Sequence, residues 1–393
     1  MAHEEGSMLG AYGEWFAGRL ADPPVLSFRQ QKQTDLTAWQ EEALARVRNL
    51  VASPGEPPTV EPRLIGRTEH DGLTIERLAW QLPFGPPTEA LFLKPARAKA
   101  RIPGVLALHD HGARKFFGKQ KITRSGIPLH PLVTEHQDHY YGGRAWANEL
   151  ARRGYGVLVH DVFPFESRAI RYAQVPQEIR SLGRTETIGG IAGGSTSADP
   201  QTIEEILEYD RWAAAQEAII AKSLFAAGTT WPGIFLFEDR TALTYLMNRD
   251  DVDPERIGCG GLSGGGLRTV YLAGTDPRVK AAVCVGFMTT WRDLLLAKAW
   301  THTWMAYTPL LPNYLDFPDL YSLRVPLPAL VLSCADDRLF SRQEMERAAS
   351  MLREVYAKAE AADRLTVSSW PGGHRFDVEM QEQAFAFFDR WLA

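Results

Sequence analysis

From Gly104 to the C-terminus, apolar runs typical of strands alternate with helical patterns, and this alternation constrains the fold more than any other feature. Strands that are apolar on both faces and separated by helices predict a mostly parallel central sheet flanked by helices. The expected fold class is therefore α/β. The predicted strands are 104–111, 156–163, 256–262, 281–287, 328–336 and 365–370, and the predicted helices are 143–153, 233–248, 264–274, 341–360 and 377–392.

The chain before Gly104 follows other patterns. Apolar spacing predicts helices over 8–20 and 35–52, and a Pro/Gly-rich stretch then ends this segment. Alternating runs predict an antiparallel ribbon with strands at 63–68, 73–82 and 89–94. We therefore expect an N-terminal helical extension over residues 1–60 and one α/β domain over residues 61–393.

Three long segments interrupt the alternation, at 113–141, 164–230 and 289–325. Each follows the carboxyl end of a predicted strand, which is where open α/β sheets bind their ligands. Loops this long in a compact domain are usually functional. We expect them to be lid-like insertions over a site.

Composition narrows the classes of partner. The 393 residues include 43 Lys and Arg against 48 Asp and Glu, a net charge of −5, which offers no general positive field for nucleic acid or an anionic membrane. No apolar run approaches the roughly 18 residues of a membrane span, and the N-terminus lacks a signal-peptide pattern. We expect a cytoplasmic protein, unless a leader was removed, with a small-molecule partner and a homo-oligomeric state left open.

The three cysteines, Cys259, Cys284 and Cys334, each lie inside an apolar run. Their number is odd, which is a poor basis for a disulfide framework, and their spacing is too wide for a compact metal site. We expect them to be core residues in a reducing compartment.

The sharpest motif is G-x-S-x-G at residues 261–265. A predicted strand runs directly into Ser263 and a helical pattern follows at once, which is the arrangement of a nucleophile elbow. Such a serine needs a histidine to take its proton and an acid to hold that histidine. The alternative interpretation is a Gly-rich turn that binds phosphate.

Both partners follow in the order that this fold requires. Asp336 and Asp337 follow the strand-like run PALVLSCA, and His374 lies in a Gly-Gly-His loop after the strand 365–370. Asp336 is preferred as the acid because it is closer to the strand. Asp337 would then cap the next helix, pair with Arg338 or point to solvent.

An oxyanion needs at least two amide donors. One is expected from Gly264, the residue after the nucleophile, and the other from the turn that contains His111, Gly112 and Ala113, with Ala113 preferred. His111 is also a candidate substrate contact.

Aromatic and apolar residues could line the substrate pocket, although most such residues belong to a core. The preferred candidates are Trp231, Trp291 and Met288. The basic cluster after the oxyanion turn has two interpretations, recognition of an anionic substrate group or a solvated face. Its members are Arg114, Lys115, Lys119, Lys121 and Arg124.

Histidines and carboxylates near the same turn suggest a metal site as a further alternative. Their spacing matches no metal motif, so we expect them to hydrogen-bond to one another, and we expect no metal and no other cofactor. These residues are His109, Asp110, His111, His136, Asp138, His139, His160 and Asp161.

Several segments together resemble the α/β-hydrolase superfamily, and within it the dienelactone-hydrolase-like and acetyl xylan esterase group. They are LALHDHGARKFFGKQKI, GTTWPGIFLFEDRTALTYL, VDPERIGCGGLSGGG, DPRVKAAVCVGFM, SCADDRLF and PGGHRF. The resemblance spans about Gly104 to the C-terminus, and it implies the α/β-hydrolase fold and a triad of Ser263, Asp336 and His374. The catalytic domain is expected over residues 61–393. Ser333, and the three glycines after Ser263, depart from the group's usual pattern and bear on the shape of the pocket.

The predicted function is a serine carboxylesterase that forms an acyl-enzyme, acting on short acyl esters such as acetylated carbohydrates or small aryl esters. The first alternative is a peptidase of the prolyl-oligopeptidase type, because SCADDRLF and the GGH loop resemble that group too. A lactone or dienelactone hydrolase, a non-catalytic binding module and a metal-dependent hydrolase are further alternatives. The fold hosts many reactions, so the substrate does not follow from it.

Overall fold

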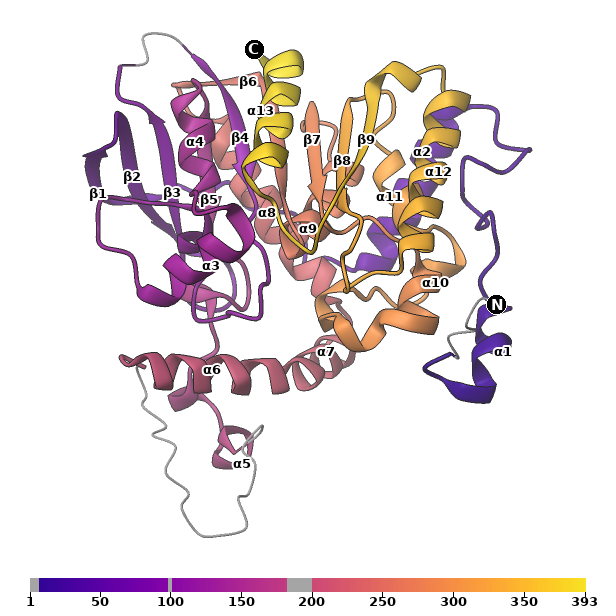
Figure 1. Ribbon diagram of the computed structural model, residues 1–393, viewed down its shortest axis with the longest axis horizontal. Coiled ribbons are helices and arrows are strands. Elements are labelled where there is room, and N and C mark those ends of the chain that lie inside the picture. Colours follow the sequence, from indigo (N-terminus) through magenta and orange to yellow (C-terminus); the bar gives the residue numbers. More distant parts are fainter. Residues whose placement is uncertain (1–6, 98–100, 182–199) are drawn as a thin grey trace.

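The computed structural model describes residues 7–97, 101–181 and 200–393. Within these residues, nine strands form one sheet in the order β1-β2-β3-β5-β4-β6-β7-β8-β9 (Figure 1). The bounds are β1 (Arg63–His70), β2 (Leu73–Trp80), β3 (Thr88–Pro95), β4 (Ile102–Ala107), β5 (Gly156–His160), β6 (Val252–Leu262), β7 (Ala281–Val285), β8 (Ala329–Cys334) and β9 (Leu365–Trp370).

The sheet joins an antiparallel edge to a parallel centre. Strands β1, β2 and β3 pair antiparallel, as does β3 with β5, whereas every pair from β5 through β4 to β9 is parallel. All residues of β5 and β7 are buried, as expected for strands covered on both faces. The predicted antiparallel ribbon and mostly parallel sheet are thus confirmed.

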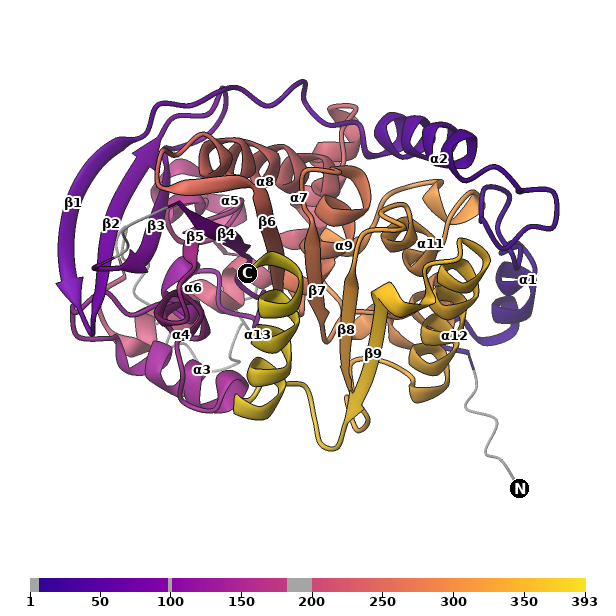
Figure 2. The ribbon, with the colours of Figure 1, turned by 90° about the horizontal axis from the view of Figure 1, so that it is seen from above.

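Helices cover both faces of the sheet. One apolar core includes side chains of α2 (Leu36–Val51), α8 (Trp231–Met247), α9 (Gly264–Thr275), α11 (Phe317–Ser322) and α12 (Arg342–Lys358). The core on the other face includes side chains of α4 (Trp146–Arg152) and α13 (Val378–Leu392). Figure 2 shows α8 and α13 on opposite sides of the strands. The three cysteines are free and buried, so the prediction that they are core residues is confirmed.

The N-terminal segment packs against this domain. Helix α2 buries Trp39, Ala43, Val47 and Val51, one helical turn apart, in the first core. The predicted helix over 8–20 is shorter: it consists of η1 (Gly10–Tyr12) and α1 (Gly13–Ala17). The boundary at residue 60 between an extension and a catalytic domain stays a prediction.

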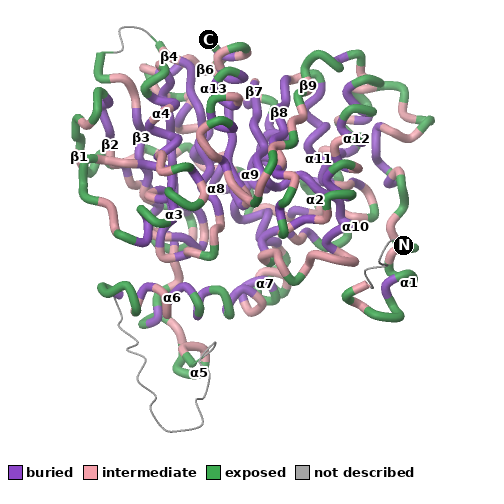
Figure 3. The backbone as a smooth tube through the Cα atoms, in the orientation of Figure 1, coloured by how far each residue is buried: buried purple, intermediate pink, exposed green. Residues whose placement is uncertain are grey.

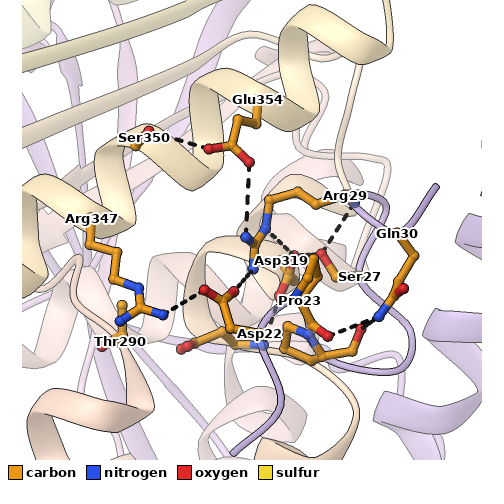
Figure 4. A network of polar contacts seen from close by, with 12 residues as sticks. Asp22, Pro23, Ser27, Arg29, Gln30, Thr290, Asp319, Arg347, Ser350 and Glu354 are labelled. Atoms are coloured by element: carbon orange, nitrogen blue, oxygen red, sulfur yellow. Dashed lines mark hydrogen bonds and ion pairs between the residues drawn. The ribbon is translucent and has the colours of Figure 1, made fainter.

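Polar contacts hold the turn before α2 to helices α11 and α12 (Figure 4). The Asp22 carboxylate accepts from Arg29 (2.7 Å) and from Arg347 of α12 (2.5 Å). The Ser27 hydroxyl donates to Asp319 of α11, which is fully buried. The N-terminal segment is therefore anchored by charge and hydrogen bonding as well as by α2.

The three insertions contain short helices. The first holds η2 (Lys119–Ile122) and α3 (Pro131–Tyr141), and the second holds η3 (Glu166–Arg168), η4 (Tyr172–Gln174), α5 (Gln177–Arg180), α6 (Ile203–Ala215) and α7 (Glu217–Ala226). Residues 182–199 of the second lie outside the described residues. The third holds α10 (Trp291–Asp293), a π-helical turn η5 (Leu294–Lys298), η6 (Ala299–Thr301), η7 (Trp304–Ala306), η8 (Leu311–Asn313) and α11.

The second insertion lies across one end of the sheet. Figure 1 shows α6 and α7 below the ends of the central strands. In Figure 3, α6 has many exposed residues, whereas the central strands are mostly buried. The remaining 3-10 turn, η9 (Ala362–Arg364), leads into β9.

Candidate active site

Ser263 occupies a sharp turn between β6 and α9. Its φ of +56° and ψ of −113° are unfavourable for a residue with a side chain, so the surrounding structure must hold the turn. A Cβ atom at Gly261 or Gly265 would lie 2.1 Å from the Leu108 carbonyl oxygen, so glycine is required at both positions. The predicted strand, turn and helix around Ser263 are confirmed.

Ser263 faces a cavity of about 220 Å³ at the carboxyl end of the sheet. The cavity is bordered by the β4 turn, the elbow, the loop after β9 and parts of the insertions. Its lining residues are Asp110, His111, Gly112, Ala113, Tyr140, Leu262, Ser263, Gly264, Leu267, Phe287, Thr301, His302, Thr303, Ala306, Leu339, Phe340 and His374.

His374 is held by a buried carboxylate. Its Nδ1 lies 2.6 Å from Oδ2 of Asp337, whose side chain is fully buried and whose Oδ1 accepts from the amide of Leu339 (2.9 Å). Because a carboxylate only accepts, Nδ1 carries a proton. The opposite nitrogen, Nε2, is buried and makes no hydrogen bond within the described residues. A neutral His374 therefore presents a lone pair on the ring edge opposite Asp337.

The preference for Asp336 as the partner of His374 is wrong. Asp336 Oδ2 instead accepts from the amide of Gly372 (2.9 Å), and the Asp336 amide donates to the Gly372 carbonyl (3.0 Å). Strand β8 ends at Cys334, and the Asp337 amide closes a turn on the Cys334 carbonyl (3.2 Å). This turn directs Asp337 to the histidine and leaves Asp336 to tie the β8 end to the loop that carries His374.

Two backbone segments meet beside Ser263. A Cβ atom at Gly264 would lie 2.8 Å from the His111 amide nitrogen, so the elbow and the β4 turn are in close contact. As the first residue of α9, Gly264 has an amide without an intrahelical acceptor. The Ala113 amide, by contrast, donates to Nδ1 of His111 (3.1 Å). The preference for Ala113 as oxyanion donor is therefore not supported. The His111 amide lies beside the elbow, and Gly112 as a donor stays a prediction.

Buried hydrogen bonds and ion pairs hold the turn after β4 in place. His111 Nε2 lies 2.7 Å from Oε1 of Glu217, at the start of α7, and Lys115 Nζ lies 2.5 Å from the same oxygen. Lys121 Nζ donates to the carbonyls of Asp110 (2.9 Å) and His111 (2.8 Å). Burial lowers the pKa of Lys121 to about 8. Burial, together with the charge of Lys115, also lowers the pKa of His111, so Nε2–H of the neutral ring donates to Glu217.

The basic cluster fits neither interpretation drawn from the sequence. Lys115, Lys119 and Lys121 are buried and bonded to protein groups, Lys119 to the carboxylates of Asp161 (2.8 Å) and Glu166 (2.5 Å). These lysines form neither a solvated face nor a free anion site. Lys115 and Lys119 join the first insertion to carboxylates of the second, and Lys121 joins it to the turn after β4.

The prediction that the histidines and carboxylates near the turn bond to one another holds for Asp110 with His136 and with His109, whereas His111, His160 and Asp161 bond to residues outside that group. The Asp110 carboxylate accepts from Nε2 of His136 (3.1 Å) and from the hydroxyl of Tyr141 (2.5 Å). His160 Nε2 lies 3.0 Å from Asp239. Over the described ranges, no group of three or more His, Cys, Asp or Glu side chains is placed to hold a metal ion.

The predicted apolar substrate contacts do not line the cavity. Trp231 is buried against Phe163 at the start of α8, and Trp291 stacks on Phe317 with ring centroids 4.0 Å apart. Met288 belongs to the core. The prediction is wrong for these three residues. Each lies shortly after a strand or at the start of a helix, and its side chain packs into the apolar core instead of the cavity. His111 does line the cavity.

Sequence reasoning missed Glu217 and His302, which the second and third insertions bring to the site. Neither lies in a recognisable motif, and only their position in long segments after strand ends pointed to them.

In the part of the chain that the structure describes, no single helix is long and apolar enough to cross a membrane. The pair α7 and α8 passes together by length and composition, with a bend of 86° between them.

Comparisons with known proteins agree with this architecture. The prolyl oligopeptidase family model matches residues 233–393. The Bacillus subtilis (strain 168) protein named "Putative hydrolase YtaP" is 26% identical over 339 residues, covering 86% of this chain and 93% of that protein.

Solved structures of esterases are similar over nearly the whole chain. A "putative acetyl xylan esterase" from Bacteroides fragilis NCTC 9343 has a TM-score of 0.65 at 16% identity, covering 94% of this chain and 84% of that one. A glucuronoyl esterase from Solibacter usitatus has a TM-score of 0.60 at 15% identity, covering 95% and 99%. The matches support the prediction of a hydrolytic enzyme, and they confirm the predicted class: the chain has the α/β-hydrolase fold.

Proposed function

We propose that this protein is a serine carboxylesterase in which Ser263, His374 and Asp337 form the catalytic triad. The observation that carries the proposal is the strained turn at Ser263, which faces the same cavity as a histidine held by a buried carboxylate. Such a combination of nucleophile, base and orienting acid is the arrangement that acyl transfer requires.

In the proposed reaction, His374 Nε2 takes the proton of the Ser263 hydroxyl as its oxygen attacks the ester carbonyl. The amides of Gly264 and His111 then donate hydrogen bonds to the oxyanion that forms. His374 passes the proton to the leaving alcohol, which yields an acyl-enzyme and a free alcohol. Water, activated by His374, attacks the acyl group and returns Ser263 with release of the acid.

The substrate class follows from the cavity and from the similar proteins. A cavity of about 220 Å³ is smaller than a drug-sized ligand site, so it suits a short acyl group or a small alcohol. The solved structures that resemble this chain include an acetyl xylan esterase and a glucuronoyl esterase, whose names describe esters of carbohydrates. We infer short esters, with acetylated carbohydrates and small aryl esters as the classes to test.

A peptidase is the second candidate, because the prolyl oligopeptidase family model covers the elbow, the acid and the histidine. Both activities use the same triad, so substrate specificity separates them. Among the described residues, the cavity lining contains one carboxylate, that of Asp110. Its Oδ1 accepts from His136 and Tyr141, and its Oδ2 lies 3.8 Å from the Lys121 ammonium, so its charge is already compensated and does not favour a substrate amino group.

The test is a kinetic panel of 4-nitrophenyl acetate, acetylated xylo-oligosaccharides and peptide 4-nitroanilides. We expect hydrolysis of the esters and at least a thousandfold lower kcat/KM for the anilides. Ser263→Ala should lose about a thousandfold or more of the ester rate. Faster cleavage of the anilides than of the esters would favour the peptidase.

A further inference from the structure

The imidazole of His302 lines the cavity together with those of His374 and His111. Three buried polar atoms of the cavity's lining residues make no hydrogen bond within the described residues: Nε2 of His374, Nε2 of His302 and Oδ2 of Asp110. The first is the proposed base. The Asp110 oxygen lies 3.8 Å from the Lys121 ammonium, which compensates its charge. This leaves His302 Nε2 without a role.

The chemistry of His302 Nε2 follows from what holds the other ring nitrogen. Nδ1 lies 2.9 Å from the carbonyl oxygen of Lys298 and 2.8 Å from the hydroxyl oxygen of Thr301. The carbonyl can only accept, so Nδ1 carries the proton, and the Thr301 hydroxyl donates its own hydrogen to a backbone carbonyl. Burial lowers the pKa of His302, which favours the neutral ring. Nε2 of that ring carries a lone pair and no hydrogen, so it can only accept a hydrogen bond.

The ring is fixed in place by elements on both sides. Lys298 ends the π-helical turn η5, and such turns are frequent at functional sites. The His302 ring packs edge to face on Phe340, with centroids 4.7 Å apart. The Thr301 hydroxyl lies 2.8 Å from the Lys298 carbonyl oxygen and 3.1 Å from the Leu339 carbonyl oxygen. The contact with Leu339 joins η6 to the loop that carries Asp337. His302 is thus a rigid acceptor attached to the catalytic loop.

We propose that His302 Nε2 accepts a hydrogen bond from a hydroxyl group of the substrate, so that the preferred esters carry a hydroxyl near the scissile bond. The proposal rests on the proposed esterase function and adds the chemical class of its substrate. A buried acceptor that gains a donor only when substrate binds favours substrates with that donor over those without it. The threonine hydroxyls on either side of His302 are already bonded to the backbone, Thr301 to the Lys298 carbonyl and Thr303 to the Met305 amide, whereas His302 Nε2 has no partner within the described residues.

The hydroxyl can belong to the acyl part or to the alcohol part of the ester, and paired substrates separate the two. The acyl pair is 4-nitrophenyl glycolate against 4-nitrophenyl methoxyacetate, and the alcohol pair is 2-hydroxyethyl acetate against 2-methoxyethyl acetate. Hydroxyl and methoxyl groups have similar inductive effects, but only the hydroxyl donates. Unsubstituted 4-nitrophenyl acetate and ethyl acetate are the references, and every rate is divided by the rate of alkaline hydrolysis.

We expect kcat/KM of the wild-type protein to favour the hydroxyl ester about tenfold or more in one of the two pairs. His302→Phe keeps the ring packing and should lose this preference, because phenylalanine cannot accept the hydrogen bond that distinguishes the hydroxyl ester from its methoxyl partner. His302→Gln, which can still accept, should restore part of it. Thermal melts of each variant establish that it is folded.

Equal rates within both wild-type pairs, or a preference that survives in folded His302→Phe, would overturn the proposal. Since the wild-type comparison needs no variant, a His302 variant that fails to fold does not remove the test. Hydrolysis of the reference esters that depends on Ser263 tests the esterase itself, so the two proposals fail in different ways.

Discussion

At the scale of single residues, two neighbouring aspartates have different tasks. Asp337 is buried and bonded to His374, and Asp336 is bonded to the backbone of the loop that carries His374. The sequence narrows the acid to these two, but the choice depends on the turn after β8, where the direction of each side chain is set by backbone angles. Adjacent residues of equal chemistry cannot be separated by pattern alone.

The pair gives a matched comparison of substitutions. Asp337→Asn keeps the size of the side chain but removes the negative charge that stabilises the His374 imidazolium, so we expect kcat on 4-nitrophenyl acetate to fall by at least about a thousandfold. Asp336→Asn keeps an acceptor for the Gly372 amide and should stay within about tenfold of wild type. The reverse order of the two effects would assign the triad acid to Asp336.

At the scale of elements, the helices and strands of the α/β domain follow from periodicity, whereas the insertions do not. The predicted strand 256–262 and helix 264–274 correspond to β6 and α9. Both could be predicted because the spacing of apolar residues indicates the strand and the helix, and the glycines indicate the turn between them. Residues 289–325 form short 3-10, π-helical and α-helical turns fixed by tertiary contacts, so neither their structure nor the place of His302 could be predicted.

Helix α11 in this insertion carries a pH-sensitive cap. Asp316 caps α11 by accepting from the amide of Phe317 (2.8 Å), and it also accepts from that of Trp291 (2.9 Å). Burial and the nearby Asp319 carboxylate raise the pKa of Asp316 to about 7. The unfolded chain releases this proton near pH 4, so between about pH 4 and 7 the folded state binds more protons. This residue's contribution to stability therefore falls as pH rises.

We expect Asp316→Asn to remove this dependence while keeping the cap acceptor. The free energy of unfolding in urea, measured from pH 4.5 to 8, should rise relative to wild type by up to about 1.4 kcal/mol per pH unit across the window. Asp35→Asn, at the exposed N-cap of α2, is the control and should show no such trend. Parallel pH profiles for Asp316→Asn and wild type would contradict the prediction.

At the scale of the whole molecule, the insertions are bonded to the site and to one another. Glu217 of the second insertion contacts His111 and Lys115 through one oxygen and accepts from the Trp304 amide of the third (3.1 Å) through the other. The sequence predicts that long segments after strand ends lie at the site. The contact between Glu217 and Trp304, however, joins residues 87 positions apart, and no local sequence pattern predicts it.

The junction predicts a coupling that urea denaturation can measure. Glu217→Leu leaves the Lys115 ammonium buried without its partner, so the free energy of unfolding should fall by about 3–5 kcal/mol. Adding Lys115→Met removes the stranded charge and should recover most of that loss. A double variant whose loss equals the sum of the two single losses would show that the pair is not coupled.

Ser263 is the proposed nucleophile of a covalent ester hydrolysis. The most direct measurement is peptide mass spectrometry after treatment of the folded protein with a fluorophosphonate, with the ester-hydrolysis rate followed in parallel. We expect one phosphonyl group per chain, located on Ser263, with loss of activity in proportion to labelling and with no label on Ser263→Ala. A label on another residue that accounts for the lost activity, or wild-type turnover by Ser263→Ala, would contradict the account.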